Sequence, residues 1–87
     1  MTRNFEDERE RWEYDFGRRL NMLRENAGMR YEDLAKAAGI GTTMTWRYLT
    51  GASEPTAYVL RNLALALGTS ADVLLGLDLE EGDIDGD

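Results

Sequence analysis

Residues 34–51 read LAKAAGIGTTMTWRYLTG, and this stretch decides the fold. It begins as a short helix in which Ala35 stands where two helices can cross closely, because a larger side chain would force them apart. Gly39 permits the positive φ that a tight turn requires. A second helix is opened by residues 41–43 and closed by Gly51. The stretch therefore predicts two short helices joined by a tight turn.

The second of these helices has an inner and an outer side. Ile40 and Thr45 are expected to point inward. The outer side then carries Thr42, Thr43, Trp46 and Arg47. This arrangement is a helix-turn-helix, whose second helix can enter a DNA major groove, which is about 12 Å wide.

The rest of the chain also has helical patterning. One helix is predicted by an apolar stripe at helical spacing, formed by Phe5, Trp12, Phe16, Leu20 and Leu23. This helix ends near Asn26 and begins either at residue 5, if Asn4 caps it, or nearer residue 12. Further helices are expected over residues 31–38, 42 to 49 or 50, 57–67 (capped by Thr56) and 71–75 (capped by Ser70). These elements predict an all-α, five-helix orthogonal bundle.

Charge divides the chain into three parts. Residues 1–13 are predicted to be a charged N-terminal extension that continues into the first helix, residues 14–77 the helix-turn-helix domain, and residues 78–87 an acidic, disordered tail. The formal net charge is −7, but residues 16–77 hold seven basic and five acidic side chains. The acidity therefore lies at the two ends, and attraction to phosphate depends on the local face rather than on the total.

Composition excludes several classes of function. The chain has no cysteine and no histidine, which removes disulfides, the usual zinc sites and the commonest general base. Most carboxylates lie near the termini, where nothing would hold them in a dry pocket. No apolar run approaches the roughly 18 residues that a membrane span needs. We expect a cytoplasmic protein that is not an enzyme, with no cofactor, no metal and no membrane association.

An ordered set of sequence elements resembles the Cro/repressor-type (lambda-repressor-like, XRE) helix-turn-helix family over residues 14–77. The matching elements are residues 16–20 (FGRRL), Leu23-Arg24, residues 31–35 (YEDLA), Gly39-Ile40, Gly51, Pro55, Leu60, residues 63–70 (LALALGTS) and residues 74–76 (LLG). The resemblance implies a sequence-specific regulator of transcription, most simply a repressor, of prokaryotic, phage or mobile-element type, which binds double-stranded DNA.

The resemblance also assigns roles by position. Base contacts are expected from Thr42, Thr43 and Arg47, with Trp46 beside them: arginine can pair with guanine, and threonine can offer a hydroxyl or touch a thymine methyl. Phosphate contacts are expected from Arg30, Tyr31, Lys36 and Thr50. Four positions depart from the family pattern. Arg30 and Gly41 replace hydroxyl caps, Thr45 replaces an inward isoleucine, and Leu49 replaces the usual glutamate partner of Arg24.

Two kinds of partner remain open. Leu65, Leu75, Leu77 and Leu79 exceed what so small a core needs, and such a surplus predicts an interface, here a homodimer that reads two half-sites. The alternative is a protein-binding module of the same fold, an antitoxin or an adaptor with weak or no DNA affinity. Trp46 fits either reading, since it can contact DNA, contact a protein partner, or pack over Tyr31.

Overall fold

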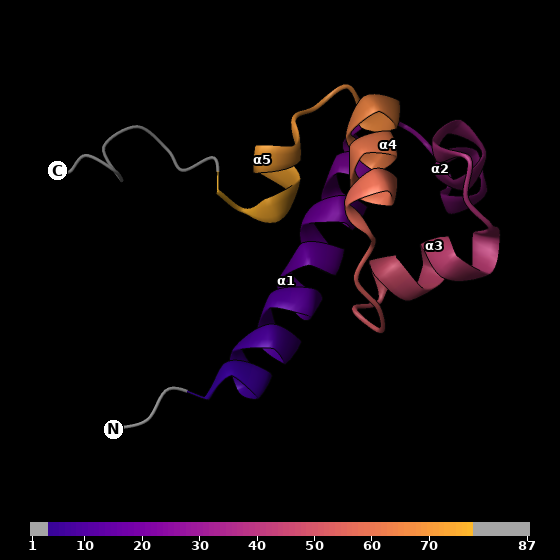
Figure 1. Ribbon diagram of the computed structural model, residues 1–87. Coiled ribbons are helices and arrows are strands. Elements are labelled where there is room, and N and C mark those ends of the chain that lie inside the picture. The colour runs from indigo at the N-terminus through magenta and orange to yellow at the C-terminus, as the bar shows by residue number, and fades with distance from the viewer. Residues whose placement is uncertain (1–3, 78–87) are drawn as a thin grey trace, which may run out of the picture.

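The computed structural model describes residues 4–77, and every regular element in this range is a helix. The helices are α1 (Phe5–Asn26), α2 (Tyr31–Ala38), α3 (Thr42–Leu49), α4 (Ala57–Leu67) and α5 (Ala71–Leu75). Figure 1 shows α3 and α5 on opposite sides of the long α1, whose N-terminal end projects past the other helices. The predicted all-α fold and its five helices are confirmed. The predicted tail over residues 78–87, with Leu79, lies outside the described residues.

Side-chain caps fix where the helices begin. The side chain of Asn4 accepts a hydrogen bond from the backbone N–H of Asp7 at 3.1 Å. Of the two starts that the sequence left open, α1 therefore takes the one at residue 5. Thr56 and Ser70 cap α4 and α5 in the same way, as predicted. Each such cap stabilises its helix by about 1 kcal/mol, since it pairs an amide that the helix cannot pair.

The core takes side chains from all of these helices. Its buried residues are Phe16, Leu20, Leu34, Ala38, Tyr48, Leu63, Ala64 and Leu74. Trp12 packs against this cluster and stacks on Phe16, with ring centroids 5.3 Å apart. The predicted apolar stripe of α1 was wrong at its first member, because Phe5 is 68% exposed on the part of α1 that projects from the bundle.

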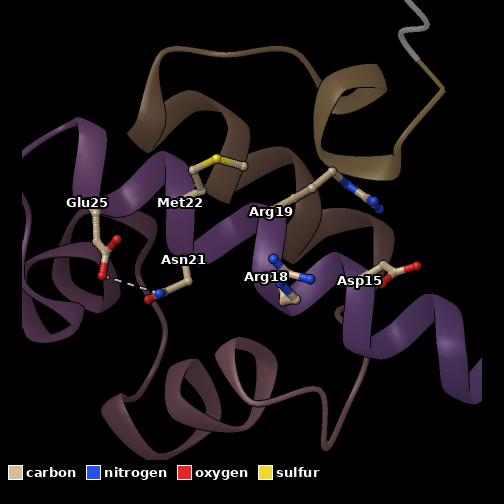
Figure 2. Close-up of a pocket in the computed structure, with 6 residues that line it drawn as sticks. All are labelled: Asp15, Arg18, Arg19, Asn21, Met22 and Glu25. Atoms are coloured by element: carbon tan, nitrogen blue, oxygen red, sulfur yellow. Dashed lines mark hydrogen bonds between the residues drawn. The ribbon is translucent and has the colours of Figure 1, made fainter.

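Two side chains of α1 hold the short helix α5. The indole Nε1 of Trp12 donates to the carbonyl of Leu75 at 3.2 Å, and Nε of Arg19 donates to the carbonyl of Leu74 at 3.1 Å. Figure 2 shows the Arg19 side chain reaching from α1 toward α5. Both donors pair carbonyls at the C-terminal end of α5, which the helix itself leaves unpaired. A helix of five residues therefore has a fixed place on α1.

Arg24 fixes the connection between α1 and α2. Its Nη1 donates to the backbone carbonyl of Met29 at 2.6 Å, and its Nε and Nη2 donate to Oδ1 of Asn21 at 3.1 and 2.7 Å. The usual partner of this arginine is absent in α3. Its guanidinium instead holds the segment that leads into the helix-turn-helix.

The backbones of α1 and of the C-terminal end of α3 touch directly at Gly17. A Cβ atom at this glycine would lie 2.7 Å from the carbonyl oxygen of Leu49 and 2.9 Å from that of Tyr48. Gly51 makes a second close approach, where a Cβ would lie 3.1 Å from the Cα of Tyr14. A Cβ at Gly17 would overlap these carbonyls, and Gly51 in addition has φ +81°, a conformation that side chains disfavour. Contact between the two backbones therefore sets how α3 sits on α1.

A small charged cluster links α1 to the loop that follows α3. Nε of Arg9 hydrogen-bonds to the carboxylate of Glu54 and lies 3.7 Å from that of Glu13. Partial burial raises the pKa of Glu13, and the hydrogen bond and negative charge of Glu54 raise it further, against the opposing effect of Arg9. Glu13 therefore binds its proton more tightly in the folded protein than an ordinary glutamate does.

We expect Gly17→Ala to lower the free energy of unfolding by about 1–3 kcal/mol, the usual cost of overpacking a site that cannot relax. The new methyl would meet backbone carbonyls of α3, which cannot rotate away. Urea unfolding followed by circular dichroism measures the change. Gly41→Ser is the matched control, because nothing lies within 4 Å of a Cβ at Gly41. Wild-type stability in Gly17→Ala would contradict the proposed contact.

We expect Glu13→Gln to raise the free energy of unfolding at pH 7 by less than about 1 kcal/mol. The folded protein binds the Glu13 proton more tightly than the unfolded chain. Stability from this group is therefore full below about pH 4.5, the ordinary pKa of a glutamate, and is lost as pH rises through the higher folded-state pKa. Thermal unfolding from pH 3.5 to 7 measures this, and the advantage of the variant should vanish at the acid end.

Candidate nucleic-acid interface

The predicted turn between α2 and α3 is formed as expected. Gly39 has φ +71° and ψ 34°, a left-handed conformation that side chains disfavour. Its N–H donates to the carbonyl of Lys36, and the N–H of Ile40 donates to that of Ala35. These bonds close the end of α2 and direct the chain straight into α3.

Thr45 lies on the inner side of α3, as predicted, and is fully buried. Its hydroxyl donates to the backbone carbonyl of Gly41 at 2.9 Å, one turn earlier in the helix. The hydroxyl is thereby satisfied without a partner from another helix, which avoids the cost of a buried unpaired donor. A threonine therefore serves at the position where the family commonly has isoleucine.

The start of α2 is capped by a residue that we did not predict. Arg30 cannot accept a bond from the helix, but the carboxylate of Asp33 accepts from the backbone N–H of Arg30 at 3.0 Å. The same carboxylate accepts from the guanidinium of Arg30 at 3.3 Å. Hydrogen bonding by the Arg30 guanidinium lowers the pKa of Asp33 most, and the bond from the backbone N–H of Arg30 lowers it further. An acid three residues after a helix start is a recognisable capping signal, so the sequence did contain this information.

The four predicted base-reading residues lie together on the exposed face of α3. They are Thr42, Thr43, Trp46 and Arg47, all classed as exposed. The ring of Trp46 packs at a tilt against that of Tyr31 on α2, with centroids 5.7 Å apart. Tyr31, Thr42, Thr43 and Trp46 line an open hollow of about 420 Å³. Of the three places foreseen for Trp46, packing over Tyr31 is present in the free protein, and 56% of the tryptophan stays exposed.

Arg47 does not point into this hollow. Its Nε donates to the hydroxyl of Ser53 at 2.9 Å, and its Nη2 reaches the carbonyl of Ala52 at 3.5 Å. The guanidinium is therefore held against the loop after α3. Nothing in the sequence pattern indicated Ser53 as its partner.

The predicted phosphate contacts lie on α2 with its N-cap and at the C-cap of α3, and they differ in availability. Lys36 is exposed on α2. Arg30 is exposed too, yet its guanidinium is paired with Asp33. The Thr50 hydroxyl already donates within α3, to the carbonyls of Trp46 at 3.0 Å and Arg47 at 3.2 Å. Phosphate would have to compete with these internal partners at Arg30 and Thr50.

Three of the four leucines expected at a dimer interface lie within the described residues: Leu65 on α4, Leu75 at the end of α5 and Leu77 just after that helix. Leu65 is 65% exposed and Leu77 is 66% exposed. Leu75 is half-buried. Tyr58, also on α4, is 68% exposed, so the exposed apolar surface of α4 is not confined to the predicted leucine.

A second hollow lies along α1 (Figure 2), and its lining is close to electrically balanced. The lining residues are Asp15, Arg18, Arg19, Asn21, Met22 and Glu25. Two carboxylates offset the two guanidinium groups there, so this hollow has little attraction for phosphate. Within residues 4–77, no three acidic side chains are grouped so that they could hold a metal ion, and no helix is long and apolar enough to span a membrane.

Comparisons with known proteins agree with this geometry. A family model described as a helix-turn-helix domain matches residues 15–77. The chain is also similar to the crystal structure of the restriction-modification controller protein C.AhdI from Aeromonas hydrophila, with 27% sequence identity and a TM-score of 0.70. That match covers 71% of this chain and 94% of the controller protein. A comparison with curated proteins found no match.

Proposed function

The chain belongs to the helix-turn-helix domain family and is a DNA-binding transcriptional regulator, and from this premise we propose that it binds a two-fold symmetric operator as a homodimer and acts as a repressor. The observation that carries the proposal is the exposed face of α3, where Thr42, Thr43, Trp46 and Arg47 stand together beside a fixed turn. Such a face, on a helix that projects its side chains into a major groove, reads base edges.

Contacts divide by chemistry. Thr42, Thr43, Trp46 and Arg47 meet bases from α3. Tyr31, Lys36, Arg30 and Thr50 flank that face and hold phosphates, which fixes the register of the protein on the duplex without reading sequence. We assign the chain no catalytic role, and we place its action in the cytoplasm of a prokaryote, where its DNA would be.

A second copy of the chain would strengthen DNA binding, because it would add a second α3 helix. Leu65 and Leu77 expose about two thirds of their surface, and together with Leu75 and Leu79 they form the proposed dimer interface. A dimer would present two α3 helices to half-sites about 34 Å apart, one turn of DNA. It would also compensate for a domain whose residues 16–77 carry only two more basic than acidic side chains.

The similar controller protein supports a regulatory role for this chain, since the match includes nearly the whole of that protein. We propose that the chain controls genes of a bacterium, a phage or a mobile element. Three features favour the partner-binding alternative: the formal net charge of −7, the absence of lysine from α3 and the exposure of Trp46. The contact of Trp46 with Tyr31 gives that ring a role within the DNA-facing surface instead.

Selection from random duplex DNA tests the proposal. The protein should retain a palindromic sequence with half-sites about ten base pairs apart when the pool is washed at about 50 mM salt and then at about 200 mM salt. Light scattering at tens of micromolar protein should give the mass of a dimer. Affinity that falls steeply with salt would identify phosphate contacts. Failure to retain any DNA at the lower salt would contradict DNA binding, and a monomeric mass would contradict the dimer.

We expect Arg47→Ala to weaken binding to the selected operator by about 1–3 kcal/mol and to relax the preference at one base pair of each half-site. To reach a base, the guanidinium must leave Ser53. Ser53→Ala should therefore keep the base preference, since it removes the competing partner rather than the reading group. If Arg47→Ala instead weakened binding to all DNA sequences equally, the arginine would contact the DNA phosphate backbone and not a base. Titration of labelled operators and of one scrambled duplex separates the two results.

A further inference from the structure

The hollow between α2 and α3 contains no charged side chain. Its walls are the rings of Tyr31 and Trp46 and the short side chains of Thr42 and Thr43. They present aromatic faces, methyl groups and hydroxyls. The hollow opens on the exposed side of α3, on the same face as the residues proposed to meet bases.

The aromatic wall has a defined position. Trp46 is 56% exposed, but its ring rests against Tyr31 at 5.7 Å between centroids. Tyr31 is itself half-buried as the first residue of α2. A ring supported in this way loses little conformational freedom on binding, so its apolar surface is available for contact at low entropic cost.

The positively charged residue nearest to Trp46 in the sequence does not line the hollow. Arg47 follows Trp46 but is bonded to Ser53 and Ala52, outside the hollow. Guanine, which offers two acceptors in the major groove, pairs best with arginine or lysine, and the hollow supplies neither. Cytosine offers an amino donor, which a carboxylate would accept best, and no carboxylate lines the hollow.

Thymine fits the lining best. In the major groove it offers the O4 acceptor and the C5 methyl group. A threonine or tyrosine hydroxyl can donate to O4, while the aromatic rings and the threonine methyls can cover the C5 methyl. We propose that this hollow binds the methyl edge of a thymine in each half-site, and that Trp46 is the residue that gives the protein its preference for that methyl. The inference rests on the proposed function, because it assigns one base contact within it.

Replacing thymine by uracil removes this methyl and leaves the base pair intact. On the operator selected above, each thymine is replaced in turn, symmetrically in both half-sites, and the Kd of the wild-type protein is measured by fluorescence anisotropy of end-labelled DNA. At one symmetric position, affinity should fall about fourfold for each half-site, the factor expected for losing burial of one methyl group. Trp46→Ala should lose most of the difference in affinity between the thymine and uracil operators at that position.

Met44→Ala is the matched control. Met44 is 39% exposed on the same helix but does not line the hollow, so this variant should keep the preference for thymine even if its overall affinity changes. Wild-type affinity that is unchanged at every uracil position would overturn the inference while leaving the proposed function in place. A preference for thymine that persists in Trp46→Ala would overturn the role of that residue. Absence of any selected operator would instead be a failure of the proposed function itself.

Discussion

The structure depends on the direct contact between the backbone of α1 at Gly17 and the carbonyls of Tyr48 and Leu49 at the end of α3. Backbone atoms cannot move aside as side chains can, so this contact sets the distance between the two helices. Gly51 extends the contact by bringing the chain after α3 against Tyr14. The inner side of α3 is then fixed by burial of Thr45 and Tyr48. Its outer side is consequently presented to solvent in one orientation.

Two polar side chains of α1 and α3 are hydrogen-bonded within their own short segments. Thr45 bonds back to Gly41, and Arg24 holds the carbonyl of Met29. Neither bond crosses between α1 and α3, so these two side chains do not contribute to placing α3 on α1. An ion pair would add Coulomb attraction, but it would also carry a desolvation cost that a close backbone contact avoids.

Helices, caps and turns were predictable here because each is governed by local chemistry. Asn4, Thr56 and Ser70 cap helices through their own side chains, and Gly39 takes the only conformation that the turn allows. Helical periodicity also predicted which residues of α3 face outward. The role of Gly17 was not predictable, because a glycine within a helix shows only weak propensity and nothing of what lies across from it. The partners of Arg30 and Arg47 depend on side-chain rotamers and on a loop, which periodicity does not describe.

Two exposed arginines are hydrogen-bonded within the protein, and these bonds affect how well the surface can distinguish one DNA sequence from another. Arg30 is engaged by Asp33 and Arg47 by Ser53 before any DNA is present. Phosphate must displace Asp33 to bind Arg30, which reduces attraction that ignores sequence, whereas Arg47 must leave Ser53 before it meets any group of the DNA. The hollow between α2 and α3 has no charged lining residue, so the base contact proposed for it would displace no such partner and would vary little with salt. The chain has a formal net charge of −7. When contacts with phosphate are weakened more than contacts with base edges, the ratio of specific to non-specific binding rises. This ratio decides whether a regulator finds its operator.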